Sequence, residues 1–146
     1  MITREADYAI RAVLELSSGA TSRSAVDLAR ATQVPYPFLR RVLAKLTAAR
    51  LVQSLRGRAG GVRLARSAAA ISLLDVTRAI DPSTITLNSC LRDGGTCERM
   101  CQCAAHEPLD RLQQELWRAL DAITFASLVK PDHVVTKTKK TTRRET

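Results

Sequence analysis

The sequence predicts a mainly α-helical protein with one small β-hairpin. Apolar residues recur at helical spacing in several segments, two of which, near 24–33 and 35–49, are separated by only a few residues. Such a short joint is what a helix-turn-helix requires. A glycine-rich turn between two short apolar runs follows directly and is typical of a hairpin. The order of these elements predicts a winged helix-turn-helix head, followed by a long C-terminal dimerisation helix.

Residues suited to capping mark where the first helices begin. Thr3 is positioned to cap a helix over residues 4–17, and Ser24 can cap the short second helix. Pro35 and Pro37 bracket the start of the third helix, because proline is favoured at the first helical position. An apolar stripe then continues that helix to about residue 49.

The hairpin and a fourth helix complete the predicted head. Residues 51–55 and 62–64 have the apolar pattern of two short strands, and the glycines between them permit a positive φ. Ser72 can cap a fourth helix, which ends at Pro82. We therefore expect residues 1–82 to form one winged helix-turn-helix domain.

Positive charge is concentrated in part of this head. The chain has a formal net charge of +9, and residues 23–66 carry ten lysines and arginines against one acid, Asp27. Residues 67–129 instead carry five arginines against eight acids. A uniformly solvated basic surface is the alternative, but it would not concentrate charge in this way. The pattern indicates one face that meets a polyanion, so we expect double-stranded DNA as the partner.

The third helix and the hairpin are where we expect the DNA contacts. A recognition helix presents its first turns to the major groove, while a wing follows the backbone or the minor groove. Small glycines would let the wing approach closely; a nucleotide-phosphate loop is disfavoured because no Lys-Ser/Thr follows and the turn leads into a strand. We expect base contacts from the first turns and a phosphate contact from Lys45. The predicted DNA-binding residues are Tyr36, Pro37, Arg40, Arg41, Lys45, Arg56, Arg58 and Gly60.

The segment after residue 107 has the seam of a helix that pairs with another helix. Leu109, Leu116 and Ile123 are seven residues apart, and Leu112, Ala119 and Ala126 repeat the same spacing. A helix from Pro108 to Ile123 would be about 24 Å long. So small a head cannot cover this stripe and Trp117 as well. We therefore expect a homodimer, with packing back onto the same head as the alternative.

The rest of the chain divides into three regions. We expect residues 83–106 to form a cysteine-rich loop, 107–129 the dimerisation helix region and 130–146 a basic, disordered tail. No signal peptide is recognisable and no apolar run is long enough to span a membrane. We therefore expect a cytoplasmic protein without membrane contact, in which thiols stay reduced.

All four cysteines lie within 14 residues of that loop: Cys90, Cys97, Cys101 and Cys103. In a reducing compartment such a cluster favours metal ligation over disulfides. Structural zinc usually shows paired Cys-x-x-Cys knuckles, and none is present here. Wide, uneven gaps and the unhindered amides of Gly94 and Gly95 suit an iron–sulfur cluster better. Zinc and a metal-free thiol switch remain the alternatives.

At these residues the sequence resembles the bacterial iron–sulfur winged-helix regulators of the IscR, NsrR and RirA type. The resemblance extends to about residue 130. Four runs carry it, together with the cysteine loop and the long helix that follows: Asp7-Tyr8-Ala9-Ile10-Arg11-Ala12, Val34-Pro35-Tyr36-x-Phe38-Leu39, Leu55-Arg56-Gly57-x-x-Gly60-Gly61-x-x-Leu64 and Ile71-Ser72-Leu73-Leu74-Asp75-Val76.

The resemblance implies a ligand set for a [2Fe–2S] or [4Fe–4S] cluster. The three cysteine ligands of the family map to Cys90, Cys97 and Cys103, and the histidine ligand of IscR-like members maps to His106. In NsrR-like members an acidic residue of the first helix, donated by the other protomer, takes that place, and Asp7 matches it. The first gap is one residue longer here than in IscR-like members. Cys101 is an additional thiol, so it and Asp7 are alternative fourth ligands.

These features together predict a sequence-specific transcription regulator, a repressor, whose DNA affinity depends on the cluster. The sensed signal would be iron, nitric oxide, redox state or cluster supply. The chain has no Walker loop, activated serine or paired-carboxylate arrangement, so we do not expect an enzyme. An electron carrier would not need the basic winged half. A zinc-stabilised DNA-binding regulator without cluster sensing is the alternative function.

Overall fold

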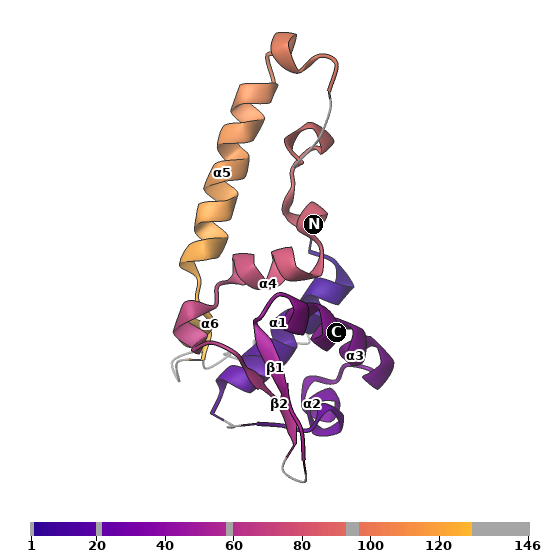
Figure 1. The fold of residues 1–146 in the computed structure, drawn as a ribbon. Helices are drawn as coiled ribbons and strands as arrows, with labels where there is room; N and C mark the ends of the chain where they lie inside the picture. The colour runs from indigo at the N-terminus through magenta and orange to yellow at the C-terminus, as the bar shows by residue number, and fades with distance from the viewer. Residues whose placement is uncertain (1, 20–21, 58–59, 93–96, 130–146) are drawn as a thin grey trace, which may run out of the picture.

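The N-terminal head is built from four helices and one hairpin (Figure 1). The structure, a computed structural model, describes residues 2–19, 22–57, 60–92 and 97–129. The elements of the head are α1 (Arg4–Ser17), α2 (Ala25–Thr32), α3 (Tyr36–Ala48), β1 (Val52–Leu55), β2 (Gly61–Leu64) and α4 (Leu73–Ile80). This arrangement confirms the mainly helical fold with a small hairpin that the sequence predicts.

The predicted caps are present at the helix starts. Thr3 Oγ1 accepts a hydrogen bond from the Ala6 amide at 3.2 Å, and Ser24 Oγ accepts one from the Asp27 amide at 3.1 Å. Ser72 and Asp75 form a reciprocal capping box at α4. Each cap satisfies amides that have no partner within the helix. The local sequence therefore sets where these helices begin.

A left-handed residue closes the turn between α2 and α3. Gln33 has φ 56°, and its amide bonds back to the last turn of α2. The Val34 amide also donates to the Ala29 carbonyl at 3.1 Å. The chain thus reverses within Gln33–Pro35, which sets α3 across α2 as a helix-turn-helix requires.

One hydrophobic core joins the head to the C-terminal part of the chain. Apolar residues of α1, α3 and α4 are fully buried together with Phe125 of the short helix α6 (Phe125–Leu128). Backbone hydrogen bonds secure the returning chain: the Phe125 amide donates to the Ile71 carbonyl at 3.0 Å, and the Leu73 amide donates to the Ile123 carbonyl at 2.9 Å. The C-terminal part is therefore fixed to the head at this point.

The long helix α5 (His106–Ala122) differs from the prediction in its limits. It begins two residues before Pro108 and ends before Ile123, which has an extended backbone (φ −92°, ψ 102°). The expectation of a helix that continues through Ile123 is therefore wrong. The cause is tertiary, because the Ile123 carbonyl is used by Leu73 and the chain must turn to bury Phe125.

A polar side chain attaches α5 to the segment that precedes the cysteines. Gln113 is fully buried; its Nε2 donates to the Ile85 carbonyl at 2.7 Å, and its Oε1 accepts from the Leu87 amide at 2.6 Å. Trp117 Nε1 donates to the same Ile85 carbonyl at 3.2 Å. One side of α5 is thus covered by its own chain, and Trp117 is half-buried there. The expectation that a partner covers Trp117 together with the leucine stripe stays a prediction.

Short 3₁₀ turns occupy the segment between α4 and α5. These are η2 (Pro82–Ile85), η3 (Ser89–Leu91) and η4 (Met100–Gln102), which follow η1 (Ala68–Ala70) in the head. The expected tail of residues 130–146 lies outside the described residues, as does Arg58 of the wing. Among the described residues, no helix is long and apolar enough to cross a membrane.

Candidate nucleic-acid interface and cysteine segment

Helix α3 buries one side and exposes the opposite one. Leu39, Val42, Leu43 and Leu46 are buried in the core of the head. On the opposite side, four exposed residues line a shallow hollow: Pro37, Arg40, Arg41 and Ala44. This cationic side has little to cover it within the described chain, so its guanidinium groups are available to a polyanion.

A second hollow separates α3 from the wing. It is lined by Tyr36, Arg40 and Thr47 of α3 and by Ser54 and Val62 of the hairpin, with Ala25, Leu43 and Ala44 completing the wall. Tyr36 is 42% exposed although it is a large aromatic residue. Apolar and aromatic atoms beside arginine are what base edges and thymine methyl groups contact in a major groove. The structure thus brings together Tyr36, Pro37, Arg40 and Arg41, as the sequence predicted.

The side of α3 that faces α1 carries an aromatic stack. The Phe38 ring lies edge-on to Tyr8 of α1, with 6.2 Å between the ring centroids. The guanidinium carbon of Arg41 lies 4.8 Å from the centroid of the Phe38 ring. Such a cation–π contact restricts the arginine to one side of the helix. Sequence reasoning did not assign this positioning role to Phe38, because its partner Tyr8 lies on another helix.

Lys45 lies on a different side of α3 from Arg40 and contacts two neighbouring helices. Its ammonium nitrogen lies 3.0 Å from Glu5 Oε2 of α1 and 3.2 Å from the Ile80 carbonyl oxygen at the end of α4. Lys45 follows Phe38 by two helical turns, so both residues face α1. A lysine at a helix C-terminus also interacts favourably with the helix dipole. Lys45 thus joins α3 to α1 and α4, and the phosphate contact expected of it stays a prediction.

Glycines shape the wing, and two of them leave no room for a side chain. A Cβ at Gly60 would lie 2.7 Å from the carbonyl oxygens of both Gly57 and Leu55, and one at Gly61 would lie 2.6 Å from the Arg23 carbonyl oxygen. Gly57 has φ +107°, which other residues rarely adopt. Gly57 and Gly60 are therefore required by the turn itself, and Gly61 by the close approach of Arg23. The exposed Arg56 precedes this turn, while Arg58 falls outside the described residues.

The base of the wing is paired with the chain that precedes α2. Arg23 and Val62 exchange two backbone hydrogen bonds, of 3.0 and 2.7 Å. The Arg23 guanidinium also forms an ion pair with Glu15 of α1 at 2.7 Å. Arg23 therefore holds strand β2 of the wing against α1. Sequence reasoning did not distinguish Arg23 from the other arginines of the basic segment.

The cysteine segment lies at the end of the molecule opposite the hairpin (Figure 1). Cys90 is in η3, and Cys97 and Cys103 flank η4 just before α5 begins. All three thiols are free. The side chain of Cys101 falls outside the described part of the structure, as do Gly94 and Gly95. The three described thiols thus lie in the segment that leads into α5.

His106 is the first residue of α5, and its Nδ1 is buried without a hydrogen-bond partner. An unpartnered buried nitrogen is costly, which indicates a role that a ligand would satisfy. Asp7, the alternative ligand, forms an ion pair with Arg11 at 2.8 Å in α1. Within the described residues, no three cysteine, histidine or acidic side chains lie close enough to form a metal site.

Comparison with known proteins places this geometry in a family. Residues 2–131 match the family model of Rrf2, described as an iron-dependent transcriptional regulator. The chain belongs to the Rrf2 family. Its relatives include the protein aau3 of Rhizobium meliloti, 32% identical over 131 residues, which cover 88% of this chain and 84% of that protein. The regulator IscR of Vibrio vulnificus is 29% identical over 136 residues, which cover 92% of this chain and 80% of that one.

Two solved structures share the fold. The IscR of T. potens superposes with a TM-score of 0.69 at 23% identity, covering 88% of this chain and 85% of that one. CymR of B. subtilis, described as its global cysteine regulator, gives a TM-score of 0.71 at 25% identity, covering 88% and 95%. These matches confirm a winged-helix, DNA-binding transcription regulator rather than an enzyme.

The Lys45 contact generates a prediction that separates a structural from a DNA-binding role. Lys45→Ala should lower the free energy of unfolding by about 1 kcal/mol, because it removes a half-exposed ion pair and a bond to a helix end. It should leave the slope of log K for DNA binding against log salt unchanged. Urea denaturation and binding titrations at several salt concentrations measure the two quantities.

Glu5→Ala is the matched control, because it removes the same ion pair from the other side. A double-mutant cycle should give a coupling energy of about 0.5 kcal/mol between the two positions. A salt slope reduced by about one unit in Lys45→Ala alone would show that the ammonium contacts a phosphate.

Proposed function

We propose that this Rrf2-family protein is a homodimeric, cytoplasmic repressor whose affinity for a DNA operator is set by an iron–sulfur cluster. The observation that carries the proposal is the buried, unpartnered Nδ1 of His106, at the point where the segment with the free thiols enters α5. The family description as iron-dependent and the similarity to IscR of Vibrio vulnificus support it. The signal would be iron, nitric oxide, redox state or cluster supply.

The donor set fits such a cluster chemically. Thiolates are the ligands that iron–sulfur clusters prefer, and the unpartnered Nδ1 of His106 offers a nitrogen donor at the end of the same segment. We assign Cys90, Cys97 and Cys103 as three ligands and His106 as the fourth, with Cys101 or Asp7 of the partner protomer as alternatives. The described side chains do not form a metal site by themselves, so the cluster would have to draw them together. When bound, a cluster supplies a centre that reacts with oxidants and nitric oxide.

The dimer rests on the side of α5 that its own chain does not cover. Leu109, Leu112, Leu116 and Ala119 keep the a/d spacing within α5, although Ile123 and Ala126 have left that helix. Leu112 is 53% exposed, which is unusual for a leucine in the middle of a helix. A second copy of α5 would bury this seam, and the resulting dimer would present two winged-helix heads to one operator.

Helix α5 connects the cysteine segment to the winged-helix head, so a change at the cysteines could alter the position of the head. Its first residue is His106, and its far end returns to the head core at Phe125. If two copies of α5 pair, ligation at the cysteine end would favour one relative placement of the two heads. This is a population shift between dimer geometries with different operator affinity.

The two arginines of α3 should contribute differently to DNA binding. Arg40 lines the hollow towards the wing, so we expect it to contact base edges, and Arg40→Ala should cost about 1–3 kcal/mol and relax the operator preference. Arg41 is held over Phe38, so we expect a phosphate contact, and Arg41→Ala should weaken all DNA alike. Fluorescence anisotropy with operator and random duplexes at several salt concentrations measures this.

Arg111→Ala on α5 is the control for lost charge, because Arg111 is exposed and paired with Glu107 far from the wing. It should leave both affinities nearly unchanged. Equal losses on random DNA for Arg40→Ala and Arg41→Ala would refute the division of roles.

The ligand assignment predicts a pattern of colour loss. Each of Cys90→Ser, Cys97→Ser and Cys103→Ser should abolish the visible absorption of anaerobically purified protein, because soft sulfur ligands are lost. His106→Ala should alter the spectrum and stability of the cluster while Cys101→Ser leaves both intact. The reverse pattern would assign Cys101, and if neither matters, Asp7→Ala is the decisive variant.

The three cysteine-to-serine variants should bind the operator with the same affinity as wild-type protein from which the cluster has been removed. The protein could instead stay colourless under anaerobic reconstitution with iron and sulfide and bind zinc stoichiometrically. That result would contradict the cluster proposal and support a zinc-stabilised regulator. DNA binding through α3 would be unaffected by that outcome.

The proposed dimer predicts the effect of a charge in its seam. Leu112→Asp should convert the dimer to a monomer and weaken operator binding, because a carboxylate would be buried without a partner. Arg111→Asp places the same carboxylate one residue away and should leave the dimer intact. Sedimentation velocity measures both, and an unchanged dimer in Leu112→Asp would move the interface elsewhere.

A further inference from the structure

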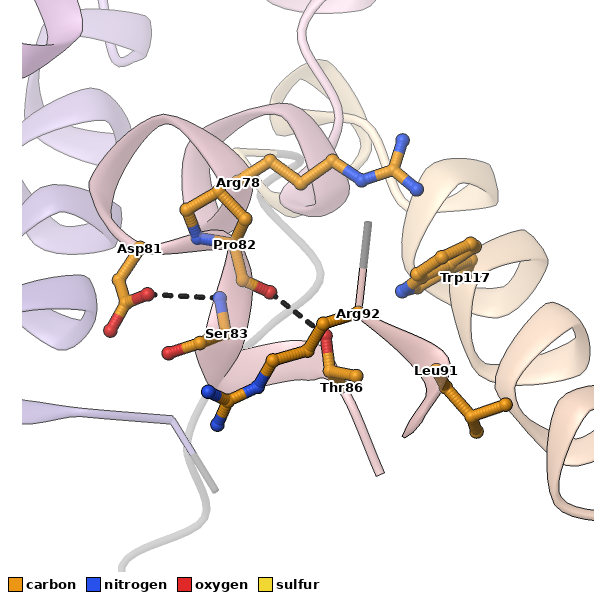
Figure 2. Close-up of a pocket in the computed structure, with 8 residues that line it drawn as sticks. All are labelled: Arg78, Asp81, Pro82, Ser83, Thr86, Leu91, Arg92 and Trp117. Atoms are coloured by element: carbon orange, nitrogen blue, oxygen red, sulfur yellow. Dashed lines mark hydrogen bonds between the residues drawn. The ribbon is translucent and has the colours of Figure 1, made fainter. Parts of the chain in front are cut away.

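A cavity lies at the junction of the head, the cysteine segment and α5 (Figure 2). Its volume is about 370 Å³, within the range of small-molecule sites. The walls come from the end of α4, from η2, from the residues directly after Cys90 and from α5. The lining residues are Arg78, Asp81, Pro82, Ser83, Thr86, Leu91, Arg92 and Trp117.

Two guanidinium groups line this cavity. Arg78 is stacked on the indole ring of Trp117, with its guanidinium carbon 4.5 Å from the ring centroid. Figure 2 shows the Arg92 side chain running from the opposite wall towards Ser83, away from Trp117. Arg92 lies near enough to the Asp81 carboxylate to help lower its pKa, while the ion pairs of the described residues do not include Arg78. Planar guanidinium groups recognise carboxylates and phosphates through paired hydrogen bonds.

The remaining polar groups of the cavity are already engaged with one another. Asp81 accepts hydrogen bonds from Ser83, including one from its amide at 2.9 Å, and these bonds lower the pKa of the Asp81 carboxyl below its ordinary value. Thr86 Oγ1 donates to the Pro82 carbonyl at 3.1 Å. Asp81 therefore stays ionised and held against η2. The two arginines still outnumber it, so the cavity favours an anion.

We propose that this cavity binds a small organic anion, whose acidic groups are held by Arg78 on one side and by Arg92 on the other and whose body lies against Trp117. Leu91 and the ring of Trp117 provide the apolar wall that such a body needs. The ligand would touch α4 of the reading head, α5 and the residue two positions after Cys90. It would thus act as an effector that is separate from the cluster and does not depend on it.

Trp117 makes the proposal directly measurable, because it is the single tryptophan of the chain. The full-length protein, prepared without iron, is titrated with inorganic phosphate and with succinate at constant ionic strength, while tryptophan emission is recorded. Saturable changes in emission are expected with one or both oxyanions and not with chloride. Emission that is flat, or that follows chloride equally, would overturn the proposal.

Arg92→Gln tests the site without touching the tryptophan ring. The apparent Kd for the oxyanion should rise at least about tenfold, because one of the two guanidinium partners is lost. Arg118→Gln, the matched control, removes the same charge from the residue next to Trp117 but outside the cavity, and should titrate like wild type. Circular dichroism establishes that both variants are folded.

An Arg92→Gln protein that binds with unchanged Kd would place the anion elsewhere and overturn the assignment. Because the titration uses protein without iron and without DNA, its outcome is independent of the cluster proposal. A protein that binds no cluster could still bind the anion here, and a protein that binds no anion could still hold a cluster.

Discussion

The return of the chain to the head core is the constraint on which the rest of the structure depends. Phe125 follows the long helix in sequence yet is fully buried among the helices of the head. Burial of a phenylalanine side chain contributes on the order of 2–3 kcal/mol, so this contact holds the end of α5 firmly. Because the Ile71 and Ile123 carbonyls are used in the same place, α5 must stop where it does. Its opposite end is left to carry the cysteine segment.

A second constraint acts along the length of α5. Gln113 fills a buried position with an amide whose two ends satisfy the Ile85 carbonyl and the Leu87 amide. A buried polar group of this kind is stable only with its partners in place, so the segment before Cys90 follows α5. The junction thereby gains the shape that encloses the cavity of Figure 2. A change at the cysteines would reach the head through contacts of this kind.

Helix α3 has one side in the core, one side against α1 and one exposed side. Only the cationic groups on the exposed side are free to contact a polyanion. The apolar stripe fixes one side in the core, and the pair of Phe38 and Lys45 fixes the side towards α1. What remains is the strip from Tyr36 and Pro37 through Arg40 and Arg41, next to a wing whose turn only glycine can form. The exposed cationic strip of α3 is therefore narrower than the basic composition of residues 23–66 suggests.

The sequence by itself determined the local elements and their order. Thr3, Ser24 and Ser72 predicted helix starts because a cap acts within one turn of its own helix. Glycine spacing likewise predicted the hairpin. Gly60 must lack a side chain because the carbonyls of residues only a few positions away lie too close for a Cβ. The family followed from motifs of the same local kind, and so did the proximity of Tyr36, Pro37, Arg40 and Arg41 on one helix.

Only the tertiary structure decided what each helix side touches. The partner of Lys45 is 40 residues away in sequence, and that of Gln113 is 28 residues away, so neither could be found from spacing. The break in the α5 seam at Ile123 has the same origin, because a long-range bond to Leu73 overrides a favourable helical pattern. Periodicity reports which side of a helix is apolar, whereas the packing of the whole chain selects what covers it.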